Sequence, residues 1–472
     1  MHSHILAEYH KFECDNKVYV LNVETMQAFR INRALSEEMD KIENDTNISA
    51  DNTSAELLAA LNQLGLLLRD QASDNGQESL LHGVPVKHIS LNVAQTCNLS
   101  CIYCYGINGE YGQKGYMDAE TARKAVDWLI SQSMDAKELI ITFFGGEPLL
   151  NFPVIKEVVQ YAREKEQQSR KRIHFSITTN GTLFSEVVNR FLNENKFSVV
   201  ISFDGDLAMQ NKNRPFKRSK RSHEITKKRI EEFLESRGGN ATGRATITAY
   251  NADLKRVRDS LMQMGFKRVE MTEASPPNLT AQAGNNRIQP SFVINTSQRK
   301  AMLEDLEEQA KETLKAVKER KHTSTSKILG IIRLLYSKRK RRYFCGVGRG
   351  LVGISISGDI YPCHRFVGIE DLKMGNINEF DGGCQKACIK NTLRNYGVMR
   401  PRCRECWARY FCGGGCMYES IQANGSETDP DENWCRELRR SVELGIAVYD
   451  QLDGADREYI RLMESGLDDR RL

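Results

Sequence analysis

Three cysteines lie close together at Cys97, Cys101 and Cys104. Three thiolates are one fewer than a structural zinc site or a fully ligated [4Fe–4S] cubane normally takes. They can hold three irons of a cubane and leave the fourth open, and an open iron can chelate a small molecule through an amine and a carboxylate. The spacing also differs from that of the ferredoxin run. The sequence therefore predicts an iron–sulfur centre with an open iron; the alternative is three neighbouring buried thiols with a packing role.

The C-terminal third holds a second concentration of cysteines. Of the 13 cysteines, nine lie between Cys345 and Cys435, and Cys14 stands apart near the N-terminus. The chain shows no export signal, so we expect a reduced, cytoplasmic protein whose thiols bind metal rather than form disulfides. A zinc ribbon is the alternative for this region, because two cysteines separated by two residues are also a zinc spacing.

The elements that must position the first motif alternate between strand and helix from about residue 86 to 285. Such an order predicts a parallel sheet with right-handed crossovers, in which chemistry sits at the C-terminal ends of the strands. The cysteine motif follows the first expected strand. The expected strands are Lys87–Val93, Leu139–Phe144, Ile173–Thr178, Ser198–Phe203, Ala245–Ala249 and Arg268–Met271.

Further motifs follow the later strands. The segment from Gly145 and Gly146 to Glu147 and Pro148 comes after the second strand. Its glycines would let the backbone approach a ligand closely, and its glutamate could accept a hydrogen bond from an ammonium group. An ordinary turn into a helix is the alternative, with Pro148 at the helix start.

Together these motifs resemble the radical S-adenosylmethionine (radical SAM) enzymes. The resemblance implies an α/β fold, a partial (β/α)6 barrel whose cluster loop follows the first strand, with SAM bound at the open iron. It implies that the segment Gly145–Pro148 binds the amino group of SAM, that Arg214 contacts its carboxylate and that Tyr105 lies near its adenine. Asn180 and Ser202 match the family pattern after the third and fourth strands, with Ser202 at a ribose or carboxylate contact. For Arg214 the alternative is a charged residue of a surface loop.

The C-terminal cysteines resemble the SPASM domain, which holds two auxiliary [4Fe–4S] clusters. By this resemblance Cys345, Cys363 and Cys416 bind the first auxiliary cluster. Leu351 stands where many SPASM enzymes have a further cysteine, so either the cluster has an open iron or Cys384 or Cys388 supplies the fourth thiolate. The second auxiliary cluster would be fully ligated, and its predicted ligands are Cys403, Cys406, Cys412 and Cys435.

We expect five segments along the chain. Residues 1–83 combine a hairpin with short helices and resemble a winged-helix-like element that binds a leader peptide by adding a strand to its sheet. A purely structural cap is the alternative. The remaining segments are the radical SAM barrel at 84–285, a helical connector at 286–342, the SPASM domain at 343–445 and a C-terminal tail at 446–472.

Composition sets limits on partners. The chain has 472 residues, and its net charge of +5 argues against strong nonspecific nucleic-acid binding. No apolar run is long enough to span a membrane. Basic runs at Lys217–Arg221 and Lys338–Arg342 are either solvated faces or landing sites for an acidic peptide.

The sequence as a whole resembles a radical SAM/SPASM peptide maturase. The predicted reaction installs a cross-link, with a cysteine thioether favoured, in a ribosomally made, cysteine-containing precursor peptide. The implied cofactors are SAM and three [4Fe–4S] clusters, and the implied electron donor is a flavodoxin or ferredoxin. The alternatives are a sulfatase-maturase-like enzyme, a carbon–carbon cross-linker, and a noncatalytic zinc or iron–sulfur scaffold for nucleic acid. The pattern assigns no further catalytic residue.

Overall fold

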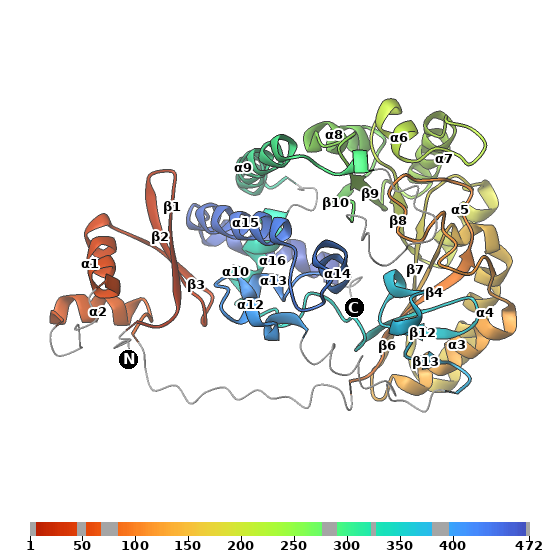
Figure 1. Cartoon of the computed structure of the whole chain (residues 1–472), viewed down its shortest axis with the longest axis horizontal. Coiled ribbons are helices and arrows are strands. Elements are labelled where there is room, and N and C mark those ends of the chain that lie inside the picture. The colour runs from red at the N-terminus through yellow and green to blue at the C-terminus, as the bar shows by residue number, and fades with distance from the viewer. Residues whose placement is uncertain are drawn as a thin grey trace.

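A computed structural model of the chain describes residues 6–44, 53–67, 84–275, 290–321, 327–379 and 396–468. Both Cys384 and Cys388 lie outside these residues. Figure 1 shows a small N-terminal module at one end, a group of helices in the middle and a larger α/β region at the other end.

The N-terminal module is a three-stranded antiparallel sheet followed by two helices. Its strands are β1 (Tyr9–Cys14), β2 (Lys17–Asn22) and β3 (Gln27–Ile31), in that order across the sheet. The sequence predicted the β2–β3 hairpin but not β1. Two helices follow, α1 (Arg33–Asn44) and α2 (Ala55–Gln63); Ser54 caps α2 by accepting a hydrogen bond from the amide of Leu57.

The larger region is built on parallel strands in sequence order, as the alternating pattern predicted. They run β10-β9-β8-β7-β6-β4 across the sheet. Their bounds are β4 (His88–Gln95), β6 (Glu138–Gly145), β7 (Arg172–Thr179), β8 (Ser198–Ser202), β9 (Thr242–Ile247) and β10 (Arg268–Glu273). The short β5 (Gly115–Tyr116) pairs with β4. The helices between them are α3 (Ala119–Gln132), α4 (Phe152–Ser169), α5 (Glu186–Glu194), α6 (Leu207–Asn213), α7 (His223–Ser236) and α8 (Leu254–Gln263).

The two faces of this sheet differ because side chains alternate along a strand. On β4, Ile89, Leu91 and Val93 belong to the main apolar core, together with residues of α3 and α4. Ser90 and Asn92 point to the other face and are buried. Within the described residues, neither the Ser90 hydroxyl nor the Asn92 amide has a hydrogen-bond partner. The face away from the helices is therefore polar where it begins to approach the cysteine loop.

The Cys-rich region extends the same sheet. Strand β11 (Leu351–Ile354) pairs in parallel with β4, and β12 (Asp359–Tyr361) and β13 (Gly375–Asn376) continue in antiparallel fashion. Short helices carry much of the remainder of this region: η4 (His364–Phe366), η5 (Glu370–Leu372), η6 (Gly397–Met399), α12 (Pro401–Arg404), α13 (Arg409–Cys412) and α14 (Met417–Asn424).

Longer helices join the regions through a second apolar core. They are α9 (Thr296–Lys318), which follows η3 (Pro290–Phe292), then α10 (Lys327–Ser337), α15 (Glu432–Asp450) and α16 (Gly454–Asp468). The expected connector thus has a buried face on α9, with Leu306 and Val317 in this core. The expected tail is helical in α16, where Ile460 is buried. None of the described helices is both long and apolar enough to cross a membrane.

Candidate functional site

The first cysteine motif forms a loop at the C-terminal end of β4. The segment after α6 holds this loop from one side: the amide of Ser100 donates to the carbonyl of Pro215 (2.8 Å), and the amide of Lys217 donates to the carbonyl of Asn98 (3.2 Å). A third bond joins the Ile102 amide to the Asn213 carbonyl (3.0 Å). The loop is therefore fixed between the end of β4 and the segment that follows α6.

The structure brings the three predicted thiols of this loop together. Burial raises the pKa of Cys97 to about 12, with a further contribution from Cys101. Burial likewise raises the pKa of Cys101 to about 12 and raises that of Cys104, and each of these two thiols also lies near another of the three. Bound metal would be needed to hold these thiols as thiolates at neutral pH.

The glycine turn after β6 packs directly on the cysteine loop. A Cβ atom on Gly145 would lie 2.2 Å from the carbonyl oxygen of Ala94, and one on Gly146 would lie 2.2 Å from that of Thr96. The amides of Gly146 and Glu147 donate to the same two carbonyls at 2.8 and 2.9 Å. Glycine is required here because backbone meets backbone.

The Glu147 carboxylate is engaged by donors of the protein itself. Its side chain is fully buried and accepts hydrogen bonds from the Leu149 amide (3.0 Å), the Thr179 hydroxyl (2.7 Å) and the Asn180 amide (2.7 Å). Burial raises its pKa to about 6. The carboxylate thus caps η2 (Pro148–Asn151) and joins β6 to β7, so a ligand at this turn would meet the backbone.

Asn180 links β7 to the cysteine loop. Its side-chain amide donates to Asn98 Oδ1 (2.9 Å) and lies 3.7 Å from Cys97 Sγ. Asn98 in turn donates to the hydroxyl of Thr182 (2.8 Å). Ser202 ends β8 opposite Arg244 of β9 and is half-buried, so it shares this edge of the sheet.

Arg214 lies beside the cysteine loop in a buried network that the sequence did not reveal. Its Nη1 donates to the Tyr103 hydroxyl (2.6 Å), which donates to Asp204 Oδ2 (2.7 Å). Asp204 is fully buried; burial raises its pKa, and the nearby guanidinium opposes that shift. In the sequence, the position of Tyr103 between Cys101 and Cys104 was the available signal for this network.

The buried Nε of Arg214 has no partner within the described residues. An unpaired guanidinium N–H is costly unless an acceptor reaches it. This orphaned donor beside the cysteine loop therefore fits the carboxylate of a ligand held at the loop.

Tyr105 joins the cysteine loop to the Cys-rich region. Its ring meets those of Tyr111 (5.9 Å between centroids) and Tyr418 (5.7 Å) edge to face. The guanidinium of Arg365 lies 5.1 Å from the Tyr105 ring and 4.5 Å from the Tyr418 ring. Because these side chains already contact the Tyr105 ring, an adenine near Tyr105 would have to pack beside them.

Cys345, Cys363 and Cys416 form a second group. Burial raises the pKa of Cys363 to about 12, and Cys416 and Cys345 raise it further. Nη1 of Arg365 lies 3.7 Å from Cys416 Sγ, and its Nη2 donates to the hydroxyl of Ser275 (2.8 Å). Arg365 also forms an ion pair with Glu419.

This second group sits over the polar face of the sheet. A Cβ on Gly353 of β11 would lie 2.6 Å from the carbonyl carbon of Cys363, so the glycine makes room for the Cys363 backbone. The His364 ring lies 4.3 Å from that of Phe144 at the end of β6. Leu351 packs against the apolar cluster that includes Cys363 and Cys416.

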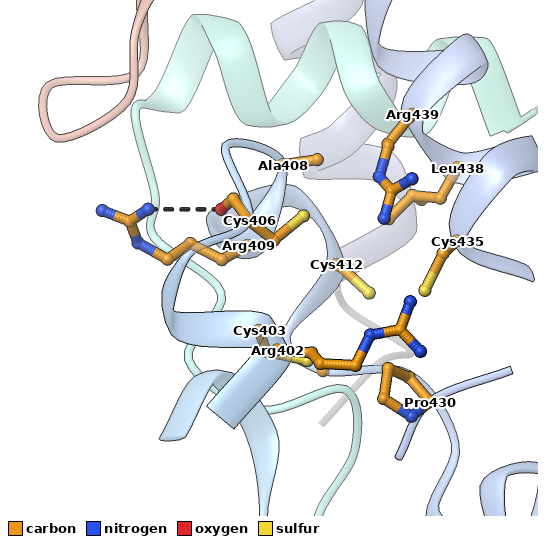
Figure 2. Close-up of a pocket in the computed structure, with 11 residues that line it drawn as sticks. Arg402, Cys403, Cys406, Ala408, Arg409, Cys412, Pro430, Cys435, Leu438 and Arg439 are labelled. Atoms are coloured by element: carbon orange, nitrogen blue, oxygen red, sulfur yellow. Dashed lines mark hydrogen bonds between the residues drawn. The ribbon is translucent and has the colours of Figure 1, made fainter. Parts of the chain in front are cut away.

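The third group is Cys403, Cys406, Cys412 and Cys435, which line one pocket (Figure 2). Burial raises the pKa of Cys403 to about 11 and that of Cys435 to about 12, with contributions from the other thiols of the group. Arg402, Arg409 and Arg439 also line the pocket. Four thiolates on a cubane would leave a net negative charge, which the Arg439 guanidinium beside Cys406 would partly offset; Arg402 and Arg409 are paired with carboxylates.

Among the described residues, no three His, Cys, Asp or Glu side chains converge as ligands of a single metal ion. Cys14 lies outside all three groups; it is buried in the core that contains α15.

The N-terminal module docks on the third cysteine group. His10 stacks on Trp407 with ring centroids 3.6 Å apart and an interplanar angle of 4°. Arg409, between Cys406 and Cys412, forms ion pairs with Glu8 and, at 2.7 Å, with Glu24.

Comparison with known proteins agrees with this geometry. Residues 91–249 match the model of the Radical SAM superfamily. Over these residues the chain is similar to radical SAM proteins. The match spans the cysteine loop, the glycine turn and Arg214, so the predicted resemblance to radical SAM proteins is confirmed.

The relatives match over part of the chain. An uncharacterized protein, MJ0907, from Methanocaldococcus jannaschii is 39% identical over 29% of this chain and 45% of its own length. The radical SAM cyclopropyl synthase TigE from Paramaledivibacter caminithermalis is 33% identical over 26% and 28%. A cysteine-type anaerobic sulfatase-maturating enzyme from Clostridium perfringens is 32% identical over 29% and 40%. The chain thus spans less than half the length of each of these three relatives.

Two solved structures share the fold over more of the chain. The structure of anSMEcpe with bound AdoMet and Cp18Cys peptide superposes with a TM-score of 0.63 at 19% identity, covering 78% of this chain and 100% of that one. Streptococcus suis SuiB bound to precursor peptide SuiA gives 0.51 at 16% identity, covering 88% and 96%. The mixed α/β fold, with a small N-terminal antiparallel sheet and a Cys-rich C-terminal region, is therefore as the sequence indicated.

Proposed function

We propose that this chain is a radical SAM peptide maturase. Cys97, Cys101 and Cys104 would hold a [4Fe–4S] cluster with SAM on its open iron, and the other two cysteine groups would hold auxiliary clusters. The observation that carries the proposal is the first group's position at the C-terminal strand ends, against a glycine turn and an orphaned arginine donor. When bound, the cluster and SAM supply reductive cleavage of SAM and hydrogen abstraction from carbon.

The residues around the loop would orient SAM. Arg214 offers a buried N–H to the carboxylate, and the glycine turn, which packs its backbone on the cysteine loop, would lie beside the amino group. Asn180 holds Asn98 beside Cys97, and Tyr103 holds Arg214 in place. Fixed donors of this kind require no reorganisation during reaction.

The proposed substrate is a precursor peptide whose leader binds the N-terminal module. In the described residues β1 and β3 are the edges of its sheet, and each pairs only with β2. An edge strand can accept an extended peptide as an added strand. The peptide-bound structures of anSMEcpe and SuiB support a peptide substrate for this architecture.

The favoured product is a cysteine thioether. Leu351 contributes an apolar side chain beside the second cysteine group, which leaves three thiols there among the described residues. A fourth position would be free for a substrate thiolate if neither Cys384 nor Cys388 fills it. A sulfatase-maturase-like activity is the second candidate, supported by the higher TM-score of anSMEcpe.

Reconstitution under anaerobic conditions tests the proposal. We expect about twelve irons per chain, and 5′-deoxyadenosine from SAM in the presence of dithionite. Coexpression with a short cysteine-containing peptide encoded beside this gene should give a product that has lost two hydrogens per cross-link. Conversion of a sulfatase peptide instead would favour the second candidate, and a zinc-bound protein without SAM cleavage would exclude both.

A leader peptide alone should bind the chain and compete with the full precursor in fluorescence anisotropy. If the core segment without its leader bound as tightly as the precursor, the recognition role of the N-terminal module would be wrong.

A further inference from the structure

An exposed basic segment, Lys217–Arg221, lies beside the first cysteine loop. Lys217 faces Glu110 at 3.9 Å. The side chains of Arg218, Lys220 and Arg221 are exposed, and within the described part of the chain they form no ion pair. Unpaired charges concentrated in one short segment produce a local positive potential rather than a stabilising network.

The backbone fixes this segment to the loop. Besides the bonds of Ser100 with Pro215 and of Lys217 with Asn98, Leu99 forms an antiparallel bridge with Phe216. Phe216 also forms a bridge with Ser219, which turns the basic residues back beside the same place. The positive charges are therefore held next to the residues that flank Cys97 and Cys101.

The second basic run, Lys338–Arg342, is placed differently. Lys340 pairs with Glu24 of the N-terminal module at 2.7 Å and lies over the ring of Tyr410. This run therefore belongs to the contact between the N-terminal module and the third cysteine group. It offers a control surface of similar composition at another place on the molecule.

We propose that Lys217–Arg221 is the docking surface for a small acidic one-electron carrier protein. The inference rests on the proposed function, because reductive cleavage of SAM consumes one electron, which the carrier would lose as it is oxidised. Such a carrier must come close to the first cysteine group, and these are exposed charges tied to its loop. A precursor peptide, by contrast, is expected to arrive through the N-terminal module. Complementary charge speeds encounter and favours one orientation.

The test compares two double variants with the wild-type holoenzyme. Arg218→Glu with Lys220→Glu reverses two charges in the segment, and Lys338→Glu with Arg339→Glu makes the same change in the other run. The probe is a flavodoxin, with its reductase and NADPH for activity. Readouts are the Kd of flavodoxin as a function of salt, carbodiimide cross-links between the two proteins mapped by mass spectrometry, and 5′-deoxyadenosine formation driven by flavodoxin or by dithionite.

We expect the first variant to bind flavodoxin at least about tenfold more weakly at low salt and the control variant to bind it nearly as the wild type does. Cross-links should include Lys217 or Lys220. The rates of 5′-deoxyadenosine formation with dithionite should be equal in all three proteins. Equal Kd values in both variants, or cross-links confined to Lys338 and its neighbours, would overturn the proposal.

The same variants would also reveal whether Lys217–Arg221 binds a different partner. If Arg218→Glu with Lys220→Glu left flavodoxin binding intact but abolished binding of the precursor peptide or of a short RNA, the carrier assignment would be wrong. If the wild type made no 5′-deoxyadenosine even with dithionite, the proposed function would be wrong. The binding and cross-linking data would still test whether flavodoxin docks on Lys217–Arg221.

Discussion

Replacing Gly146 with alanine should disable the first cysteine group without unfolding the chain. The added Cβ would lie 2.2 Å from the Thr96 carbonyl oxygen, 2.5 Å from its carbon and 2.8 Å from the Gly109 oxygen, all of them backbone atoms. Ordinary contact begins near 3.4 Å. The turn and the residue before Cys97 must therefore separate by about 1 Å, and a misplacement of that size can cost about 10²-fold in rate.

The assay is 5′-deoxyadenosine formation with dithionite, together with iron content and thermal unfolding. Overpacking should also lower the free energy of unfolding by about 1–3 kcal/mol. The other two cysteine groups lie elsewhere, so no more than about a third of the expected iron should be lost. Gly330→Ala is the matched control: no atom lies within 4 Å of the new Cβ in α10, and it should stabilise the helix by about 0.5–1 kcal/mol. A wild-type rate for Gly146→Ala would refute the reasoning.

Three other predictions concern side chains near or within the proposed network, one ion pair and the second cysteine group. Tyr103→Phe removes the hydroxyl between Arg214 and Asp204. We expect the free energy of unfolding to fall by about 1–3 kcal/mol and the KM for SAM to rise. If neither the free energy of unfolding nor the KM changed, the network would not have the role inferred for it. Asp456 has its pKa lowered to about 2 by Lys318 and Arg320, so its stabilisation is present above the unfolded pKa and lost as pH falls toward 2. Asp456→Asn should therefore lower the free energy of unfolding, measured in urea, by about 1–2 kcal/mol at pH 7 and by less at pH 3. An equal loss at both pH values would show that the stabilisation by Asp456 does not come from its charge. Cys384→Ala with Cys388→Ala should keep all iron and thioether formation if the second group has an open iron, whereas loss of one cluster with the product would identify a ligand.

The sequence predicted the parallel sheet because strand and helix patterns alternate strongly and because buried strands carry continuous apolar residues. The short spacing of Cys97, Cys101 and Cys104 marked the first group, whereas the membership of the other two groups came from the resemblance to the SPASM domain. The strand β1 was missed because its side chains alternate weakly; most of them are only partly buried. Likewise β11 could not be assigned to the sheet, because its pairing with β4 joins segments far apart in the chain.

Roles that depend on tertiary contact were harder to predict. Glu147 is chemically able to bind an ammonium group, yet three protein donors occupy its carboxylate. The N-terminal residues looked like a separable module, but Tyr19, Leu21 and Met26 are buried in the core with α10 and α15. Deleting residues 1–83 would therefore expose an apolar surface, and peptide competition is the cleaner test of their role.

The contacts between regions run from the N-terminal module through the third cysteine group to the first cysteine loop. The N-terminal module meets Arg409 of the third cysteine group, and that region continues to α14, where Tyr418 meets Tyr105 of the first cysteine loop. A peptide whose leader is bound at the outer module (Figure 1) would have to extend along this series before its core reached the strand ends. Leader binding would then raise the local concentration of the core at the site, as any tether does when its length matches the distance. The residue that reacts would be set by spacing from the leader as well as by its own chemistry.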